Sequence, residues 1–229
     1  MNTIRFNGFN QIHKGLRALL FDTALQLQHT DFSDPAAAEQ SFSLVEQALW
    51  LFDGHADTED HFFFARVKEH APAFIAAMED EHVIDHNLGE SLRKGMQAYR
   101  SATSQQERIQ CGYEVMLSIF AFTAFNLTHM NKEETEVNAI IWKHYSDDDI
   151  HAMIATALQH IPPHKNQVYS RWMMRGLGNH EISSWLKQVA AVAPEEVYEG
   201  LRQLAKEEVP PARWLLIKQE LHLQETATV

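Results

Sequence analysis

Five histidines and two glutamates recur at helical spacing in this sequence and could together hold metal ions. The spaced pairs are His55/Glu59, His82/His86 and His129/Glu133. Residues four apart share one face of a helix, so both members of each pair can point at one object. Imidazole nitrogens suit iron, zinc and copper, and carboxylate oxygens suit harder cations. The pairs therefore raise the hypothesis of a metal centre.

A single pair carries little information. Chance gives about one His-x-x-x-Glu match in a chain of this composition, and the sequence contains three, the third being His86/Glu90. The pair His160/His164 is misleading, because two prolines between its members prevent a regular helix. Only convergence of several pairs can decide the question.

The elements that would position these pairs are helices. Glycine and proline are scarce, with nine and seven copies, and apolar residues recur at three- and four-residue spacing. We expect long helices over about residues 7–28, 34–68, 72–100 and 105–145. Short connections make such helices antiparallel neighbours, which predicts an all-α fold built on an up-down-up-down four-helix bundle.

Beyond residue 145 the sequence changes to shorter amphipathic segments. They cover about residues 147–159, 165–176, 179–193, 195–208 and a last helix opened by Pro210 and Pro211. Trp172 and Trp185 need an apolar surface to cover, so this C-terminal set of shorter helices should pack on the bundle. The predicted division is a bundle at 1–145 and a helical extension at 146–229.

Position along the bundle tests whether the pairs meet. His55/Glu59 and His82/His86 lie about a dozen residues on either side of the same turn, which is about 18 Å from one end at the rise of an α-helix. His13 on the first helix lies at a comparable level. His129/Glu133 matches less well, by about five residues. All four helices thus direct ligands at one layer of the core.

Such a layer needs cations. Unpaired polar groups inside a bundle cost several kcal/mol for each carboxylate, and no lysine or arginine occupies the facing positions. Two divalent metals bridged by Glu59 and Glu133 would neutralise the cluster. Five imidazoles divided as three and two would leave the second metal an open position.

The ordered set resembles the hemerythrin-like, or HHE cation-binding, family. "HKGLRALL" (13–20) and "HMNKEETEV" (129–137) are similar to its local signatures, and the resemblance covers residues 1 to about 145. It implies a bundle holding two iron ions, oxo- or hydroxo-bridged, that binds dioxygen or another small diatomic ligand for sensing, storage or detoxification. The implied metal ligands are His13, His55, Glu59, His82, His86, His129 and Glu133.

The last carboxylate ligand has two candidates. Oxygen-carrying hemerythrins place an aspartate five residues after the final histidine, where this chain has Glu134. Glu133 stands at four residues, on the face of His129, with Glu134 about 100° further round the helix. We favour Glu133, a choice that weakens the case for an oxygen carrier.

Other functions stay open at this point. A ferritin-like iron or peroxide oxidase would use Glu-x-x-His on two helices, and Glu79/His82 fits that motif once. A regulatory interaction module could use the metal to stabilise its fold, with a protein partner bound through the C-terminal helices. Zinc and manganese are alternatives to iron.

Composition excludes several classes. A formal net charge of -12 argues against nucleic acid and against an anionic membrane surface. Cys111, the single cysteine, leaves no disulfide and no thiolate zinc site. No signal peptide or membrane-spanning segment is evident, so we expect a cytoplasmic protein. The histidines expected on the surface are His61, His144, His151, His160, His164, His180 and His222.

Overall fold

The all-α prediction is confirmed by the computed structural model of the chain, which describes residues 5–222. Helices joined by short turns make up these residues, and none of them is in a strand. The long helices are α1 (Asn10–His29), α2 (Pro35–Thr58), α4 (Pro72–Ser101) and α5 (Gln105–Lys132). Their first residues lie within a few residues of those expected from apolar spacing and capping residues. α2 and α5 end earlier than expected as α-helices, but the helical chain continues beyond each of them, to Val67 and to His144.

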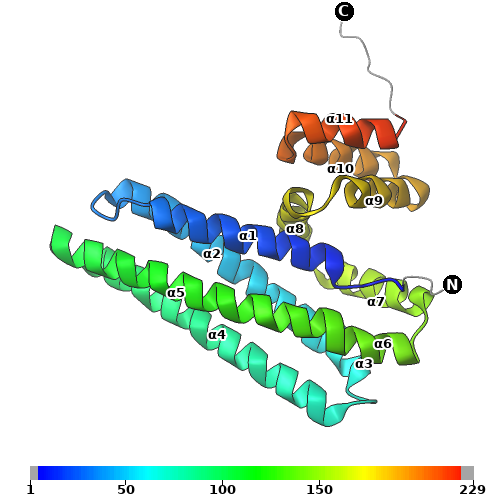
Figure 1. Ribbon diagram of the computed structural model, residues 1–229, viewed down its shortest axis with the longest axis horizontal. Coiled ribbons are helices and arrows are strands. Elements are labelled where there is room, and N and C mark those ends of the chain that lie inside the picture. The colour runs from blue at the N-terminus through cyan, green and yellow to red at the C-terminus, as the bar shows by residue number, and fades with distance from the viewer. Residues whose placement is uncertain (1–4, 223–229) are drawn as a thin grey trace, which may run out of the picture.

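The long helices lie side by side as a bundle (Figure 1). α1 contacts α2 and α5, while α4 contacts α2 and α5. Their apolar stripes meet in one core that includes Leu16, Phe42, Leu92 and Phe122, each exposed by at most 1 %. Removing such side chains from water is the main favourable contribution to folding.

The residues predicted to cap the N-termini of helices make the expected hydrogen bonds. Asp34 accepts a hydrogen bond from the amide of Ala36 at 2.9 Å, and Pro35 opens α2. Ser104 and Glu107 form a reciprocal capping box at the start of α5. Each arrangement satisfies amide groups that the first turn of a helix leaves unpaired.

α2 and α5 each widen into a π-helical turn that the apolar spacing did not predict. The first, η1, covers Glu59–Phe64 and continues into α3 (Ala65–Val67). The second, η2, covers Glu133–Val137 and continues into α6 (Asn138–His144). Each wide turn begins at the glutamate of a His-x-x-x-Glu pair, and π-turns inside α-helices are frequent at functional sites.

The shorter helices follow as expected. They are α7 (Asp147–His160), α8 (Pro163–Gly176), α9 (Asn179–Val192), α10 (Glu195–Glu208) and α11 (Pro211–Glu220). α7 and α8 lie against the bundle, and α9, α10 and α11 stack beyond them (Figure 1). The division into two domains stays a prediction.

α8 approaches α1 unusually closely. A Cβ added to Gly15 would lie 2.8 Å from the amide nitrogen of Met173, and one added to Gly176 would overlap the carbonyl oxygen of Lys14. Only glycine permits such close backbone contact. Tyr169 on α8 also donates a 2.5 Å hydrogen bond to the carbonyl oxygen of Leu51. The extension is thereby fixed to the turn that carries His13.

One expectation about membranes needs correction. The continuous helix Gln105–His144 is long and apolar enough to cross a bilayer, with a mean hydropathy of 1.2 over its best window. Core helices of soluble proteins have the same property, and this helix packs against α1 and α4. By itself, the property does not place the chain in a membrane.

Candidate metal centre

Six of the seven predicted ligands meet in the core. They come from α1, α2, η1, α4, α5 and η2, and none is exposed by more than 9 %. The six are His13, His55, Glu59, His82, His129 and Glu133. Their ligand atoms fall into two groups, in each of which all atoms lie within 4.8 Å of one another.

The first group contains two histidines of α1 and α2 with both glutamates. The Nε2 atoms of His13 and His55 are 3.1 Å apart. His13 Nε2 lies 3.4 Å from Glu59 Oε1 and 3.4 Å from Glu133 Oε2, and His55 Nε2 lies 3.1 Å from Glu59 Oε1. We call this set the α1–α2 half of the cluster.

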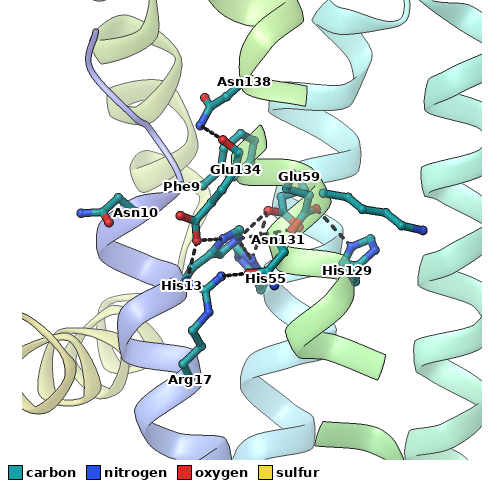
Figure 2. A network of polar contacts seen from close by, with 12 residues as sticks. Phe9, Asn10, His13, Arg17, His55, Glu59, His129, Asn131, Glu134 and Asn138 are labelled. Atoms are coloured by element: carbon teal, nitrogen blue, oxygen red, sulfur yellow. Dashed lines mark hydrogen bonds and ion pairs between the residues drawn. The ribbon is translucent and has the colours of Figure 1, made fainter. Parts of the chain in front are cut away.

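The second group contains the histidines of α4 and α5. His82 Nε2 lies 3.6 Å from Glu59 Oε2 and 3.9 Å from Glu133 Oε1, while His129 Nε2 lies 3.1 Å from Glu133 Oε1. We call this set the α4–α5 half. Figure 2 shows His13 and His55 on one side of Glu59 and His129 on the other.

The two glutamates therefore serve both halves. Glu59 presents Oε1 to the α1–α2 half and Oε2 to the α4–α5 half, and Glu133 presents Oε2 and Oε1 in the same way. A carboxylate that offers one oxygen to each of two positions can bridge two cations. Each half then supplies two imidazoles and two carboxylate oxygens.

Several ligand atoms have no hydrogen-bond partner although they are buried. Among residues 5–222 these atoms include Glu59 Oε2, His82 Nε2, His129 Nε2 and both carboxylate oxygens of Glu133. Leaving such groups unpaired costs about 1–3 kcal/mol each, and more for charged ones. Cations between the two halves would satisfy all of them, so the residues fit a dinuclear metal site.

Burial and charge shift the titration of these groups. Burial together with the nearby Glu59 charge raises the pKa of Glu133. Burial lowers the pKa of His13, but hydrogen bonds to Glu134 and Glu59 outweigh it and raise the pKa to about 9. For His82, contacts with Asp60 and Glu59 outweigh burial and raise the pKa to about 10. Two facing carboxylates thus attract positive charge, as protons or as metal.

Carboxylates outside the cluster orient three of the four imidazoles. His82 Nδ1 donates to Asp60 at 2.9 Å, and His129 Nδ1 donates to Glu81 at 2.9 Å. His13 Nδ1 donates to Glu134 at 3.0 Å. A proton on Nδ1 leaves the Nε2 lone pair directed at the cluster, which is how metal-binding histidines are normally held.

These orienting groups were not predicted from the sequence. Asp60 follows the ligand Glu59, and Glu81 precedes His82. That adjacency is a weak signal, because neighbouring helix positions face about 100° apart. Glu134 appeared in the sequence only as an alternative ligand. In the structure it pairs with Arg17 at 2.6 Å and with His13 Nδ1, whereas Glu133 lies in the cluster.

His86 requires a correction. Its spacing from His82 predicted a place in the site, but its side chain is 62 % exposed and its Nδ1 lies 3.8 Å from Asp53. Asp85, about 100° back around α4, is buried at that level and accepts a 2.6 Å hydrogen bond from Asn126. The structure therefore provides four clustered imidazoles, two for each half, in place of five divided as three and two.

The remaining boundary of the cluster is aromatic. Phe9 stacks on His13 at a centroid distance of 5.4 Å, Phe64 on His82 at 5.3 Å, and Phe125 on His129 at 6.1 Å. These rings keep water from most of the layer, which strengthens electrostatic interactions inside it.

Comparison with known proteins identifies one family. The family model for the hemerythrin HHE cation binding domain matches residues 7–141, a span that contains all six clustered residues. No curated protein and no solved structure matches the chain.

Proposed function

Since this chain belongs to the hemerythrin HHE cation-binding family, we propose that its six-residue cluster holds two iron ions and that the protein binds dioxygen or a related diatomic molecule. Sensing, storage and detoxification are the roles such binding would serve. The family match shows a cation-binding domain. The identity of the metal, the number of metal ions and the diatomic ligand are what we propose.

The shared glutamates are the observation that supports two metals. A single cation would be bound by one histidine pair only, so either His13/His55 or His82/His129 would have no metal ion to bind. Two cations give every Nε2 atom and every carboxylate oxygen of the cluster a ligand bond. Two buried, ionised glutamates are also costly to the fold unless cations lie beside them.

The donor set supports iron. Bridging carboxylates favour iron or manganese over copper, and imidazoles suit iron and zinc. His13, His55, His82, His129, Glu59 and Glu133 would hold the metals with four protein donors each, and a six-coordinate ion would then have room for a small ligand. Iron would supply reversible redox chemistry toward dioxygen, and the protein would exclude water and hold the donors in place.

A ferritin-like oxidase has less support. Such sites combine single glutamates on two helices with Glu-x-x-His on the other two, which makes carboxylates outnumber imidazoles. Here imidazoles outnumber carboxylates. Glu79, the one residue that fits the motif, accepts a hydrogen bond from Lys68 at 2.7 Å and lies outside the cluster.

Metal analysis joined to absorption spectroscopy tests the proposal. The purified chain, reconstituted without oxygen, should hold about two irons and should develop a new absorption band when air is admitted. Less than one iron for each chain after reconstitution, with zinc bound instead, would refute the iron assignment.

α4 offers a matched pair of variants for the same measurement. His82→Ala removes a clustered imidazole and should lower the iron content to about one or less. His86→Ala removes an exposed imidazole from the next turn of the same helix and should leave the iron content unchanged. Equal losses in the two variants would contradict the assignment of ligands from the structure.

A further inference from the structure

A cavity of about 470 Å³ lies between the bundle and the C-terminal extension. The start of α1, the end of α2 and η1 form one wall, and α7, α8, α9 and α10 form the others. Figure 1 shows these shorter helices on the side of α1 and α2, away from α4. The extension thus encloses space that the bundle alone would leave open to solvent.

The cavity reaches the metal centre on one side only. His55 and Glu59 belong to its lining, whereas His82 and His129 do not. A molecule at its deep end would therefore lie beside the α1–α2 half of the cluster.

The lining selects a chemical class of occupant. Phe9, Phe63, Ile154 and Met173 are representative of a mostly apolar wall that includes neither lysine nor arginine. Glu59 is its one carboxylate. Apart from the imidazoles of His55 and His151, an anionic ligand would meet no side chain there that can carry a positive charge. A strongly charged ligand of either sign would lose most of its hydration without replacement.

A few neutral polar groups complete the wall. The side-chain amides of Gln11, Asn166 and Gln188 make no side-chain hydrogen bond within residues 5–222. The indole N–H of Trp185 is likewise uncommitted there. These donors and acceptors can fix the orientation of a neutral polar group on an otherwise apolar molecule.

The volume of this cavity argues against a diatomic gas as its ligand. Ligand cavities of about 300–1,000 Å³ hold organic molecules rather than gases. The mouth is lined by apolar side chains, among them Val192, which is 87 % exposed, and Val197, which is 54 % exposed. Such a rim favours entry of an apolar molecule from water.

We propose that this cavity binds a neutral organic molecule with an aliphatic or aromatic body and a single uncharged polar group, next to the α1–α2 half of the cluster. The walls consist of this chain's own side chains, so the inference stands apart from the proposed iron and dioxygen chemistry.

Fluorescence titration of the full chain tests the proposal. N-phenyl-1-naphthylamine, a neutral apolar probe, should bind at one saturable site, and 1-decanol should displace it. Decanoate and decyltrimethylammonium should compete at least about tenfold less well. Saturable binding that the two ions displace as well as decanol does would overturn the assignment of a neutral ligand.

α9 provides a matched control for the location. Ala193→Trp places a bulky side chain in the lining and should weaken probe binding at least about tenfold. Ala191→Trp places the same side chain two residues earlier, on an exposed, non-lining position in the last turn of α9, and should leave binding unchanged. Val189→Phe, a second lining variant, guards against misfolding of the first, with helix content measured for each.

The outcomes separate this proposal from the one about iron. Binding is measured on protein loaded with iron and on protein from which metal has been removed, with metal content recorded for both. Saturable binding in both forms supports the cavity whatever the metal proves to be. Equal binding by the Ala191 and Ala193 variants, or no saturable binding in either form, overturns it.

Discussion

The two halves of the cluster share their glutamates but differ in what lies behind the histidines. In the α4–α5 half both imidazoles are oriented by carboxylates, His82 by Asp60 and His129 by Glu81. In the α1–α2 half only His13 has such a partner, and His55 borders the cavity. From this difference we predict that the α4–α5 half holds its metal more rigidly and that a ligand reaches the α1–α2 half.

Lys132 strengthens this contrast. It pairs with Glu81, which in turn orients His129, so two charged groups support one imidazole. No carboxylate orients Nδ1 of His55 in the described part of the chain. An imidazole without that support can rotate more freely, as ligand exchange on the cavity side would require.

Removal of a glutamate that both halves share should change metal binding most. Glu133→Gln deprives both halves of a bridging oxygen, and we expect the metal content to fall from about two to near zero for each chain. The metal-free variant should nevertheless be more stable than the metal-free parent, by on the order of 1–2 kcal/mol, because burial and Glu59 already disfavour the ionised carboxylate. Metal analysis and thermal unfolding measure the two effects.

A control for that variant lies next to it. Glu134→Gln alters the orienting hydrogen bond to His13 but no atom of the cluster. It should weaken metal binding without abolishing it. Complete loss of metal from this variant and retention by the Glu133 variant would reverse the ligand assignment.

The second effect should be confined to one half. Glu81→Gln removes the charge that orients His129, and loss of such a group typically costs 10–100-fold in metal affinity. We expect one of the two metals to bind that much more weakly while the other keeps its affinity. Competition with a chelator, followed as a two-step titration, gives both constants.

Glu79→Gln is the matched control, because Glu79 lies on the same helix and pairs with Lys68 instead. It should bind both metals as the parent does. Weakening of both metals by the Glu81 variant would show that the halves are not independent.

The third effect concerns the wall of the α1–α2 half. Gly176→Ala forces α8 away from the carbonyl oxygen of Lys14, which should destabilise the chain by about 1–3 kcal/mol and weaken probe binding in the cavity. Gly200→Ala on α10 adds a Cβ that meets nothing within 4 Å. It should stabilise the chain by about 0.5–1 kcal/mol, the usual gain for this change within a helix. Denaturant unfolding compares the two.

The smallest effect is a release of protons from histidines of both halves. Contacts with carboxylates raise the pKa of His13 to about 9 and the pKa of His82 to about 10, against an ordinary 6.5. Protonation therefore stabilises the metal-free fold fully below pH 6.5, and this stabilisation is lost as pH rises through 9 and 10. Metal must displace these protons, and despite burial the contact with Glu133 raises the pKa of His129 as well. Binding near neutral pH should therefore release at least about two protons for each chain.

Calorimetry in buffers with different heats of ionisation measures that release. Metal affinity should fall as the solution is acidified, with loss of metal below about pH 5. Binding without proton release, or full metal content at pH 4, would contradict the protonation assigned to the cluster.

Much of the fold was predictable because capping residues and apolar spacing are local signals. Asp34, Pro35 and Ser104 begin helices for reasons contained in their own turns. Height along the bundle also follows from the rise per residue, which placed His13, His55 and His82 in one layer and His129 about five residues from it.

Rotation around a helix was harder to predict than height. His86 shares a motif with His82, yet the buried stripe of α4 passes through Asp85 and Gly89 instead. Residues four apart on a helix point about 40° apart. Whether both of them face the core depends on how the helices pack together, and the sequence of one helix does not determine that packing. The orienting partners Asp60 and Glu81 depend on the same packing.

The two wide turns have a consequence for the length of the chain. From each histidine the buried residues continue in steps of four, through 55, 59, 63 and 67 and through 129, 133, 137 and 141. Such a row would drift about 40° with every step in a regular α-helix, and the extra residue in η1 and η2 keeps it straight. Shortening either segment by one amino acid would turn everything downstream by about 100° and expose Val67 or Ile141 to water. The one extra residue in each of η1 and η2 therefore keeps the metal-centre residues and the apolar residues that follow them on the same face of each helix.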